Sequence, residues 1–379
     1  MKKVSASNDR NLNGETHVWH VFVAPSSSVN GITQAIKGYE NATAAVHFRT
    51  ITDLVEDGAG SARSFRRTTA LTLRSLRELA QRPPDVVHFH SLFRPPHAFL
   101  GLVCLLRKVP FVVSVHGACN PAALQRDERR KRLYLRFVDG PLVRRAFAVA
   151  ALTRQEQQHV KQAIGQVGVT VVGNPIPPSD TSPRDSSDRN TLPDSVEPAR
   201  TISSLGRFDV WGKRLDLVAD IARRSPHITF RVYGERDEHN QPELFDALLK
   251  TCPPNLEFLA PVFGAQKMAM LANSDGFLLL SRSEGLSMAL LESLQHKVLC
   301  FVSEAVAATL DTDDPAALVV VLSDNPEAAA NELQNAVSER EKHRARIEMA
   351  EVFVQENYAP AIVGARLKDL YGRARGDTT

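Results

Sequence analysis

The sequence is short of cysteine, of net charge and of long apolar runs, and each shortage excludes a class of protein. Its 379 residues include four cysteines, Cys104, Cys119, Cys252 and Cys300, none in a C-x-x-C pair. That spacing argues against a disulfide framework or a zinc site and predicts reduced thiols in a cytosolic protein. The formal net charge of +3 is too small to predict a nucleic-acid partner.

The longest apolar stretch, AFLGLVCLL at 98–106, is about half of the ~20 residues that a membrane-spanning helix needs. The first twenty residues contain two lysines but no apolar segment, so we expect neither a signal peptide nor a membrane anchor. A hydrophobic content of 43% over this length predicts two ordinary globular domains. We therefore expect a cytoplasmic protein, with attachment to the inner face of a membrane left open.

In the first half of the chain, strand and helix patterns alternate. Short apolar runs that predict buried strands lie at 17–24, 84–91, 109–117, 146–153 and 169–175. Strands that alternate with helices form βαβ units and a parallel sheet, which binds ligands at the carboxyl ends of its strands. The polar residues expected at those ends are 26–31, His90, His116, Thr153 and Asn174.

The composition changes at PIPPSDTSPRDSSDRNTLPDSVEPAR, residues 175–200, which is rich in Pro, Ser and Asp and predicts an interdomain linker. The alternation then resumes, with helices expected at 213–224, 242–250 and 265–272. The predicted fold class is α/β, with two Rossmann-like doubly wound parallel sheets facing across a cleft. The expected domains are 1–176, a linker or mobile loop at 177–200, 201–355, and a C-terminal helix at 356–379 that could pack back on the first domain.

Two cations follow the first predicted strand of the second half. Arg207 and Lys213 lie six residues apart in a loop before a helix. Two fixed cations suit a diphosphate, whose charge rises as it departs as a leaving group. The alternative is a pair of solvated surface charges.

Two carboxylates, Glu284 and Glu292, lie in SRSEGLSMALLESLQ, residues 281–295, with seven residues between them. The start of the predicted helix offers free backbone N–H groups, a ready anion site. Glu292 would lie about 7 Å further up the helix, at ~1.5 Å per residue, where a carboxylate could accept two hydrogen bonds from a ribose diol. The alternative for Glu292 is an exposed helix residue.

An ordered set of segments carries a family resemblance. PDVVHFHS, SVHG and ALTRQE in the first half, and GRFDVWGKRLDL, VYGE and NSDGFLLLSRSEGLSMALLE in the second, occur in this order. With them the chain resembles the retaining glycosyltransferases of the GT-B fold, in particular glycosyltransferase family 4, over nearly its whole length.

The resemblance implies a metal-independent enzyme without a cofactor, which moves a sugar from a nucleotide diphosphate to a hydroxyl of a saccharide or lipid-linked acceptor, in surface polysaccharide or glycolipid biosynthesis. It also implies roles for individual residues. Arg207 and Lys213 would hold the diphosphate, and Glu292 the ribose. Glu284 and the amides of Gly285, Leu286, Ser287 and Met288 would hold the transferred sugar. His116 would lie near the reacting sugar, and Gly31 and Asn174 would belong to the donor site.

The chain departs from the family pattern in its glycines. Gly31 stands alone where a glycine pair is usual, Arg214 follows Lys213 where a glycine is usual, and 295–310 lacks the expected Gly-x-Pro. Since these segments line the donor site, two alternatives stay open. One is a nucleotide-sugar epimerase of the same fold. The other is a catalytically degenerate scaffold that only binds a nucleotide sugar.

Two patterns resemble metal sites. Asp311, Thr312 and Asp313 spell D-x-D, but Asp314 and Pro315 suit a helix N-cap and first position, which favours a capping loop. His88 and His90 lie on one strand face, and no third ligand is near them in the sequence. We therefore expect no metal.

The stretch 126–147 is basic, with apolar residues between the charges. A helix of this kind could rest on anionic lipid headgroups. The alternative is a solvated helix that packs its apolar residues inward. A nucleic-acid partner is not expected, because no aromatic platform accompanies the charge.

Overall fold

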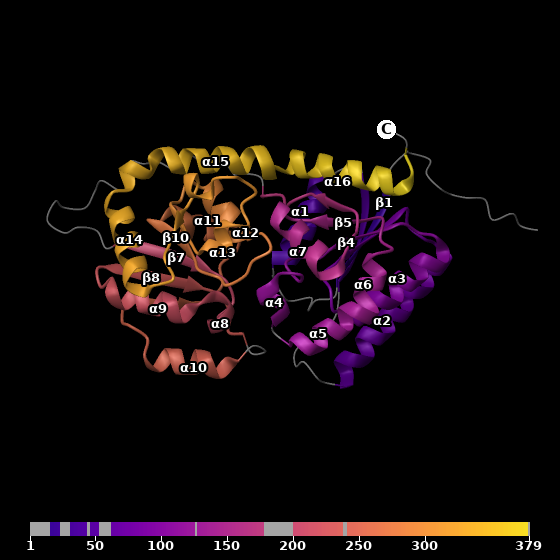
Figure 1. Cartoon of the computed structure of the whole chain (residues 1–379), viewed down its shortest axis with the longest axis horizontal. Coiled ribbons are helices and arrows are strands. Elements are labelled where there is room, and N and C mark those ends of the chain that lie inside the picture. Colours follow the sequence, from indigo (N-terminus) through magenta and orange to yellow (C-terminus); the bar gives the residue numbers. More distant parts are fainter. Residues whose placement is uncertain are drawn as a thin grey trace, which may run out of the picture.

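The computed structural model describes residues 16–22, 31–43, 46–52, 62–125, 127–177, 200–237 and 241–377, with the backbone alone at 46–52 and 62–71. Two six-stranded parallel sheets, each covered by helices, form two lobes that lie side by side (Figure 1). This confirms the predicted fold class.

The first sheet has the order β2-β1-β3-β4-β5-β6, so the chain reverses its winding direction after β2. The strands are β1 (Thr16–Phe22), β2 (Val46–Thr52), β3 (Val86–His90), β4 (Phe111–Ser114), β5 (Ala148–Ala151) and β6 (Val169–Val171). Its helices are α1 (Gly31–Ala42), α2 (Ala62–Gln81), α3 (Pro95–Arg107), α4 (Pro121–Gln125), α5 (Glu128–Tyr134), a π-helix η1 (Leu135–Asp139), α6 (Gly140–Val143) and α7 (Arg154–Ile164). The strand β2 was not predicted, because it is an edge strand whose sequence VHFRTIT mixes polar and charged with apolar residues.

The second sheet has the order β12-β11-β10-β7-β8-β9. Its strands are β7 (Arg200–Leu205), β8 (Ile228–Tyr233), β9 (Leu256–Leu259), β10 (Gly276–Leu279), β11 (Cys300–Val302) and β12 (Val320–Val321). Its helices are α8 (Val210–Lys213), α9 (Leu215–Arg224), α10 (Pro242–Lys250), α11 (Gly264–Ala272), α12 (Met288–Gln295), α13 (Glu304–Ala307) and α14 (Pro326–Ser338), with 3-10 turns η3 (Pro315–Ala317) and η4 (Arg340–His343).

The helix predicted at 213–224 is wrong at its start. Arg214 has a positive φ of 53°, which ends α8 at Lys213 and starts α9 at Leu215. A positive φ is costly for a residue other than glycine, so Arg214 adopts here a turn that glycine would form without that cost. Lys213 therefore closes a short helical turn instead of opening a long helix.

The last two helices connect the lobes. α15 (Arg344–Tyr358) runs along the second lobe, and α16 (Pro360–Arg375) continues over the first (Figure 1). Val363, Leu367 and Tyr371 of α16 are buried in one cluster with side chains of β1, β3 and β4. Gly364 allows α16 to approach α1, since a Cβ there would lie 2.1 Å from the Ala42 carbonyl oxygen. The end of the chain is thus part of the core of the first lobe.

Candidate active site

The two lobes touch at the loops that follow β4 and β10. Gly117, with φ 79°, packs its backbone against Gly285, and a Cβ on Gly285 would lie 3.1 Å from the Gly117 nitrogen. The positive φ favours glycine at Gly117, and a side chain at Gly285 would crowd this close approach. The contact places His116, at the end of the first lobe's central strands, next to Glu284 and the start of α12.

Lys213 and Glu284 form an ion pair at this junction. Lys213 Nζ lies 2.5 Å from Glu284 Oε1, and the Ser281 hydroxyl donates to the same oxygen at 2.6 Å. The two charged side chains are 26% and 17% exposed. Asp209 caps α8 by accepting a hydrogen bond from the Gly212 amide, which fixes the turn that presents Lys213. The pair combines a cation and a carboxylate that are both largely shielded from water.

Arg207 follows β7 and is oriented by a buried carboxylate. Its Nη1 donates to Asp237 Oδ2 at 2.7 Å, and Asp237 is buried while the Arg207 side chain is 64% exposed. The guanidinium therefore has a fixed position but keeps donors free for an anion, since it carries five N–H groups. Sequence reasoning missed Asp237, which lies thirty residues further on the next strand's loop.

Glu292 is buried within α12, and the alternative of an exposed helix residue is wrong. It is 4% exposed and pairs with Lys267 Nζ of α11 at 2.6 Å. Burial raises the pKa of the Glu292 carboxyl, while Lys267 opposes that shift. The Ser287 hydroxyl caps α12 by accepting from the Leu290 amide. Sequence reasoning missed Lys267, because nothing in its own segment marks it.

Glu156 holds the loop that carries His116. Its carboxylate accepts hydrogen bonds from the Gly117 amide at 2.5 Å and the Leu152 amide at 2.6 Å, and Thr153 caps α7 by accepting from the Glu156 amide. Burial raises the pKa of this carboxyl, and the two amide bonds oppose the shift. Glu156 was not predicted, although the T-x-x-E spacing in ALTRQE, which is typical of a capping box, is a signal that could have found it.

The two remaining predicted donor-site residues have different surroundings. Gly31 is the first residue of α1, and the preceding turn, 23–30, lies outside the described residues. Asn174 is buried, accepts a hydrogen bond from the Tyr39 hydroxyl at 2.8 Å, and donates to the Leu286 carbonyl at 3.5 Å. Asn174 thus connects the first lobe to the loop before α12.

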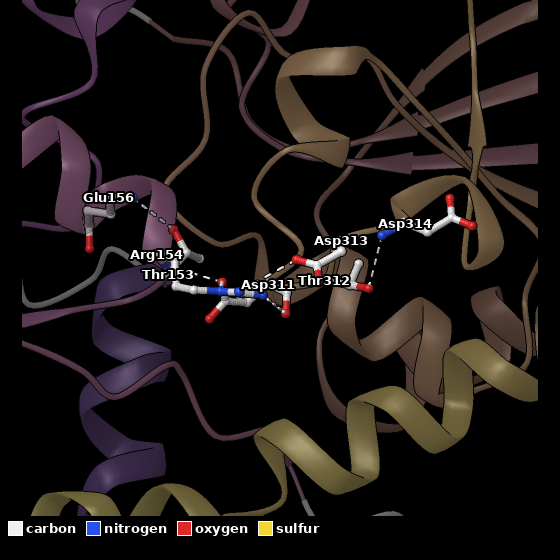
Figure 2. Close-up of polar contacts among 7 residues, drawn as sticks. All are labelled: Thr153, Arg154, Glu156, Asp311, Thr312, Asp313 and Asp314. Atoms are coloured by element: carbon white, nitrogen blue, oxygen red, sulfur yellow. Dashed lines mark hydrogen bonds and ion pairs between the residues drawn. The ribbon is translucent and has the colours of Figure 1, made fainter.

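Asp311 and Asp313, the two carboxylates of the D-x-D triplet in the second lobe, contact Arg154 of the first lobe (Figure 2). Arg154 Nε donates to Asp311 Oδ1 at 2.6 Å, and its Nη1 lies 3.6 Å from Asp313 Oδ1. Asp314 occupies the expected N-cap position of a 3-10 turn that begins at Pro315, but its side chain makes no capping hydrogen bond. Capping was therefore an incomplete interpretation, because Asp311 and Asp313 act as an ionic contact between the lobes.

We expect Asp311→Asn to lower the Tm by about 2 °C or less, because exposed ion pairs contribute little to stability. We expect Mg²⁺ or Mn²⁺ to leave the Tm unchanged in both proteins. Scanning fluorimetry with and without each ion measures this, with Asp220→Asn, which removes a carboxylate from a separate surface ion pair on α9, as the control. A metal-dependent rise in Tm that Asp311→Asn removes would show that the triplet is a metal site.

The expectation that His88 and His90 have no third neighbour is wrong. His20 on β1 pairs in register with His88 on β3, and ring nitrogens of the three histidines lie within 4.8 Å of one another. Sequence distance hides this, because β1 and β3 are joined through β2 and two helices.

The basic stretch 126–147 is not one helix. It consists of α5, the π-helix η1 and α6, which ends at Val143, and Arg126 lies outside the described residues. Leu135 and Val143 are buried, whereas Leu133, Phe137 and Phe147 are exposed. The alternative in which the apolar residues pack inward therefore holds only for part of the stretch, and contact with lipid headgroups stays a prediction.

Comparisons with known proteins match both lobes. A family described as glycosyl transferase 4-like domain matches residues 44–175, and glycosyl transferases group 1 matches residues 199–339. No curated protein sequence matches the chain significantly.

Solved structures share the fold over almost the whole chain. A sucrose-phosphate synthase from Thermosynechococcus elongatus has a TM-score of 0.74 and 14% identity, covering 96% of this chain and all of that one. The Anabaena protein Alr3699/HepE in complex with UDP-glucose has a TM-score of 0.72 and 14% identity, covering 95% of this chain and all of that one. The OtsA apo structure has a TM-score of 0.63 and 11% identity, covering 95% and 99%.

Proposed function

The chain belongs to the GT-B glycosyltransferases, and from this premise we propose that it moves a sugar from a nucleotide-diphosphate donor to a hydroxyl with retention of the anomeric configuration and without a metal. The observation that carries the proposal is the junction between the lobes. There the Lys213–Glu284 pair, the amide-lined start of α12 and His116 come together from the segments that follow β4, β7 and β10.

The chemistry of this junction suits departure of a diphosphate. Cleavage of the sugar–phosphate bond places negative charge on the leaving group and positive charge on the sugar. Lys213 and Arg207 would bind the diphosphate, and the amides of 285–288 would add the positive end of the α12 dipole. Glu284 would hold sugar hydroxyls, and it also orients Lys213 through their ion pair. These groups stabilise the leaving group by fixed charge.

Donor recognition would use the second lobe. The buried carboxylate of Glu292 can accept hydrogen bonds from a ribose diol, and its ion pair with Lys267 opposes the rise in its pKa that burial causes. The complex of HepE with UDP-glucose, which has the same fold, supports a UDP-hexose as the first donor to test.

A donor panel tests the proposed function. We expect UDP, GDP or ADP with their sugars to raise the Tm, the matching one by several degrees, because a ligand that binds only the folded state stabilises it. We also expect a radiolabelled sugar to move from that donor to an added saccharide or lipid-linked acceptor. Isomerisation of the donor without transfer would indicate the epimerase alternative. Binding without sugar release would indicate a scaffold.

We propose further that the first lobe rests on an anionic membrane at the cytoplasmic face, where a lipid-linked acceptor would be presented. None of the helices in the described part of the chain has the length and apolar content to cross a bilayer. Phe137 and Leu133 are 67% and 59% exposed between exposed arginines of α5 and η1, which is the composition of a surface that binds headgroups.

Replacing both Leu133 and Phe137 with serine should lower binding to vesicles that contain phosphatidylglycerol by about tenfold, since each loses buried apolar area. Co-sedimentation at low and high salt measures this, and wild-type binding should fall with salt. Val352→Ser on α15, an exposed apolar residue of the other lobe, is the control. Equal binding by the double variant would exclude this surface.

A further inference from the structure

Four histidines lie in a row beneath the junction, on three neighbouring strands of the first sheet. His20 lies in β1, His88 and His90 lie in β3, and His116 is the second residue after the end of β4. The first three are 0% exposed, whereas His116 is partly exposed where it meets the second lobe. A buried polar group is costly unless it is hydrogen-bonded, so the partners of these rings need to be identified.

Hydrogen bonds join these rings, together with Ser114 and Tyr371, into one hydrogen-bond network, called here the histidine network, which starts at the backbone of the sheet. The Ser114 hydroxyl donates to the Ala150 carbonyl at 3.1 Å and contacts His88 Nε2 at 2.9 Å. His88 Nδ1 lies 2.8 Å from the Tyr371 hydroxyl of α16, which in turn lies 3.4 Å from His20 Nε2.

The histidine network then continues to the junction between the lobes. His20 Nδ1 lies 2.7 Å from His90 Nε2, and His90 Nδ1 lies 2.9 Å from His116 Nε2. The nitrogen at the far end is His116 Nδ1. Within the described ranges, no residue forms a hydrogen bond with this nitrogen. Among the histidines of this network, His116 is thus the one with a ring nitrogen available to a ligand at the junction.

The hydrogen bonds of the histidine network have a single favourable direction of donation. Burial lowers the pKa of all four rings, to about 3 for His20 and about 4 for His116, so each is neutral and carries one N–H. A carbonyl can only accept, so the Ser114 hydrogen goes to Ala150 and His88 must donate to Ser114 from Nε2. His88 Nδ1 then accepts from Tyr371.

The remaining bonds follow in order. Tyr371 accepts from His20 Nε2–H, His20 Nδ1 accepts from His90 Nε2–H, and His90 Nδ1 accepts from His116 Nε2–H. The opposite direction would need the Ser114 hydrogen to point at His88 and would lose the bond to Ala150. Because the opposite direction has one hydrogen bond fewer, the bond from Ser114 to the Ala150 carbonyl favours the first direction through all of these side chains.

A metal bound by His20, His88 and His90 fits these contacts less well. All six ring nitrogens of these residues already face a hydrogen-bond partner. An ion would have to displace several of these contacts, and each displaced donor would be left buried without an acceptor.

We propose that Ser114, His88, Tyr371, His20 and His90 are positioning residues that hold His116 in its Nε2–H tautomer, so that its Nδ1 is a hydrogen-bond acceptor for a hydroxyl of the transferred sugar. The role toward the sugar rests on the proposed function, whereas the tautomer does not. An acceptor nitrogen attracts a hydroxyl and repels a carboxylate, so donors with a neutral sugar are favoured over donors with a uronic acid.

Nitrogen-15 NMR of the full chain labelled at histidine tests the tautomer directly. In the wild-type protein we expect His116 to show a protonated Nε2 and an unprotonated Nδ1. Tyr371→Phe keeps the buried ring but removes the link between His88 and His20, so His116 should become a mixture of tautomers. Tyr39→Phe is the matched control, because Tyr39 stacks on His88 and His90 but its hydroxyl donates to Gly173 and Asn174.

Ser114→Ala and Ser114→Thr test the origin of the direction. The alanine variant removes the link to Ala150 and should give the same mixture, whereas threonine keeps a hydroxyl and should restore the wild-type spectrum. With a neutral nucleotide sugar, Ser114→Ala should lower kcat/KM about tenfold, the effect of one lost hydrogen bond, while the affinity for the nucleotide alone stays the same.

Three results would overturn the proposal. They are a wild-type His116 protonated at Nδ1, equal changes in Tyr371→Phe and Tyr39→Phe, and stoichiometric zinc in the purified protein with metal-shifted nitrogens at His20, His88 and His90. If the expected tautomers are observed but no nucleotide sugar binds, the proposed function is wrong, whereas the proposal that hydrogen bonds hold His116 in one tautomer is supported.

Discussion

Lys213→Ala is expected to lower kcat by about 10²- to 10³-fold, with a much smaller effect on nucleotide affinity. Removing one preorganised group that stabilises developing charge in a shielded site typically has an effect of this size. Lys213 is held 2.5 Å from Glu284 at the junction of the lobes, where a departing diphosphate would lie. Its charge would therefore matter most when the sugar–phosphate bond breaks.

Single-turnover kinetics with a labelled donor, together with nucleotide titration, separates the two effects. Lys250→Ala, which removes an exposed lysine at the end of α10, is the control and should stay within about twofold of wild type, as expected for a surface charge. The double variant Lys213→Ala/Glu284→Gln shows how much of the loss comes from leaving Glu284 without its partner. Wild-type kcat in Lys213→Ala would remove Lys213 from the mechanism.

Glu292→Ala is expected to weaken nucleotide binding by about 10- to 100-fold, the effect of losing hydrogen bonds to a charged group. The carboxylate lies 2.6 Å from Lys267 and is almost completely buried, so it is fixed in position before any ligand arrives. A fixed acceptor needs little reorganisation to bind a diol, which is why its removal should affect affinity more than the chemical step.

Comparison of UDP with 2′-deoxy-UDP by calorimetry makes the test specific. Wild type should bind the deoxy nucleotide more weakly, and Glu292→Ala should bind the two alike, because the missing hydroxyl and the missing carboxylate belong to one contact. Measurements well below the Tm of the variant exclude unfolding, which the unpaired Lys267 could promote. An unchanged preference for the ribose hydroxyl in Glu292→Ala would place the ribose elsewhere.

The two variants separate binding from chemistry within one site. Lys213 is the last residue of α8 and Glu292 lies in α12, and both contact a charged partner that their own segment does not supply. A glycosyltransferase should lose turnover with the first and donor affinity with the second. A scaffold would show only the second effect, since it has no chemical step to lose.

The sequence alone predicted the parts of the molecule that depend on local patterns. Alternating strand and helix periods gave two parallel sheets, and α10 lies at the residues where its pattern placed a helix. The positions of Arg207 and Glu284 after strand ends, and of Lys213 and Glu292 in the helices that follow, also depend on local order, because the carboxyl end of a parallel strand is where the next loop begins. The break at Arg214 was missed because it depends on one backbone angle.

Only the tertiary structure decided which charges and rings meet. Lys267 reaches Glu292, Arg154 reaches Asp311, and Tyr371 of the last helix reaches histidines near the start of the chain. Such contacts depend on the order of strands in each sheet and on where α16 packs, and neither leaves a period or a spacing in the sequence. The physical reason is range: backbone propensity and hydrophobic period act within a few residues, whereas an ion pair or hydrogen bond forms between whichever groups the fold brings to about 3 Å.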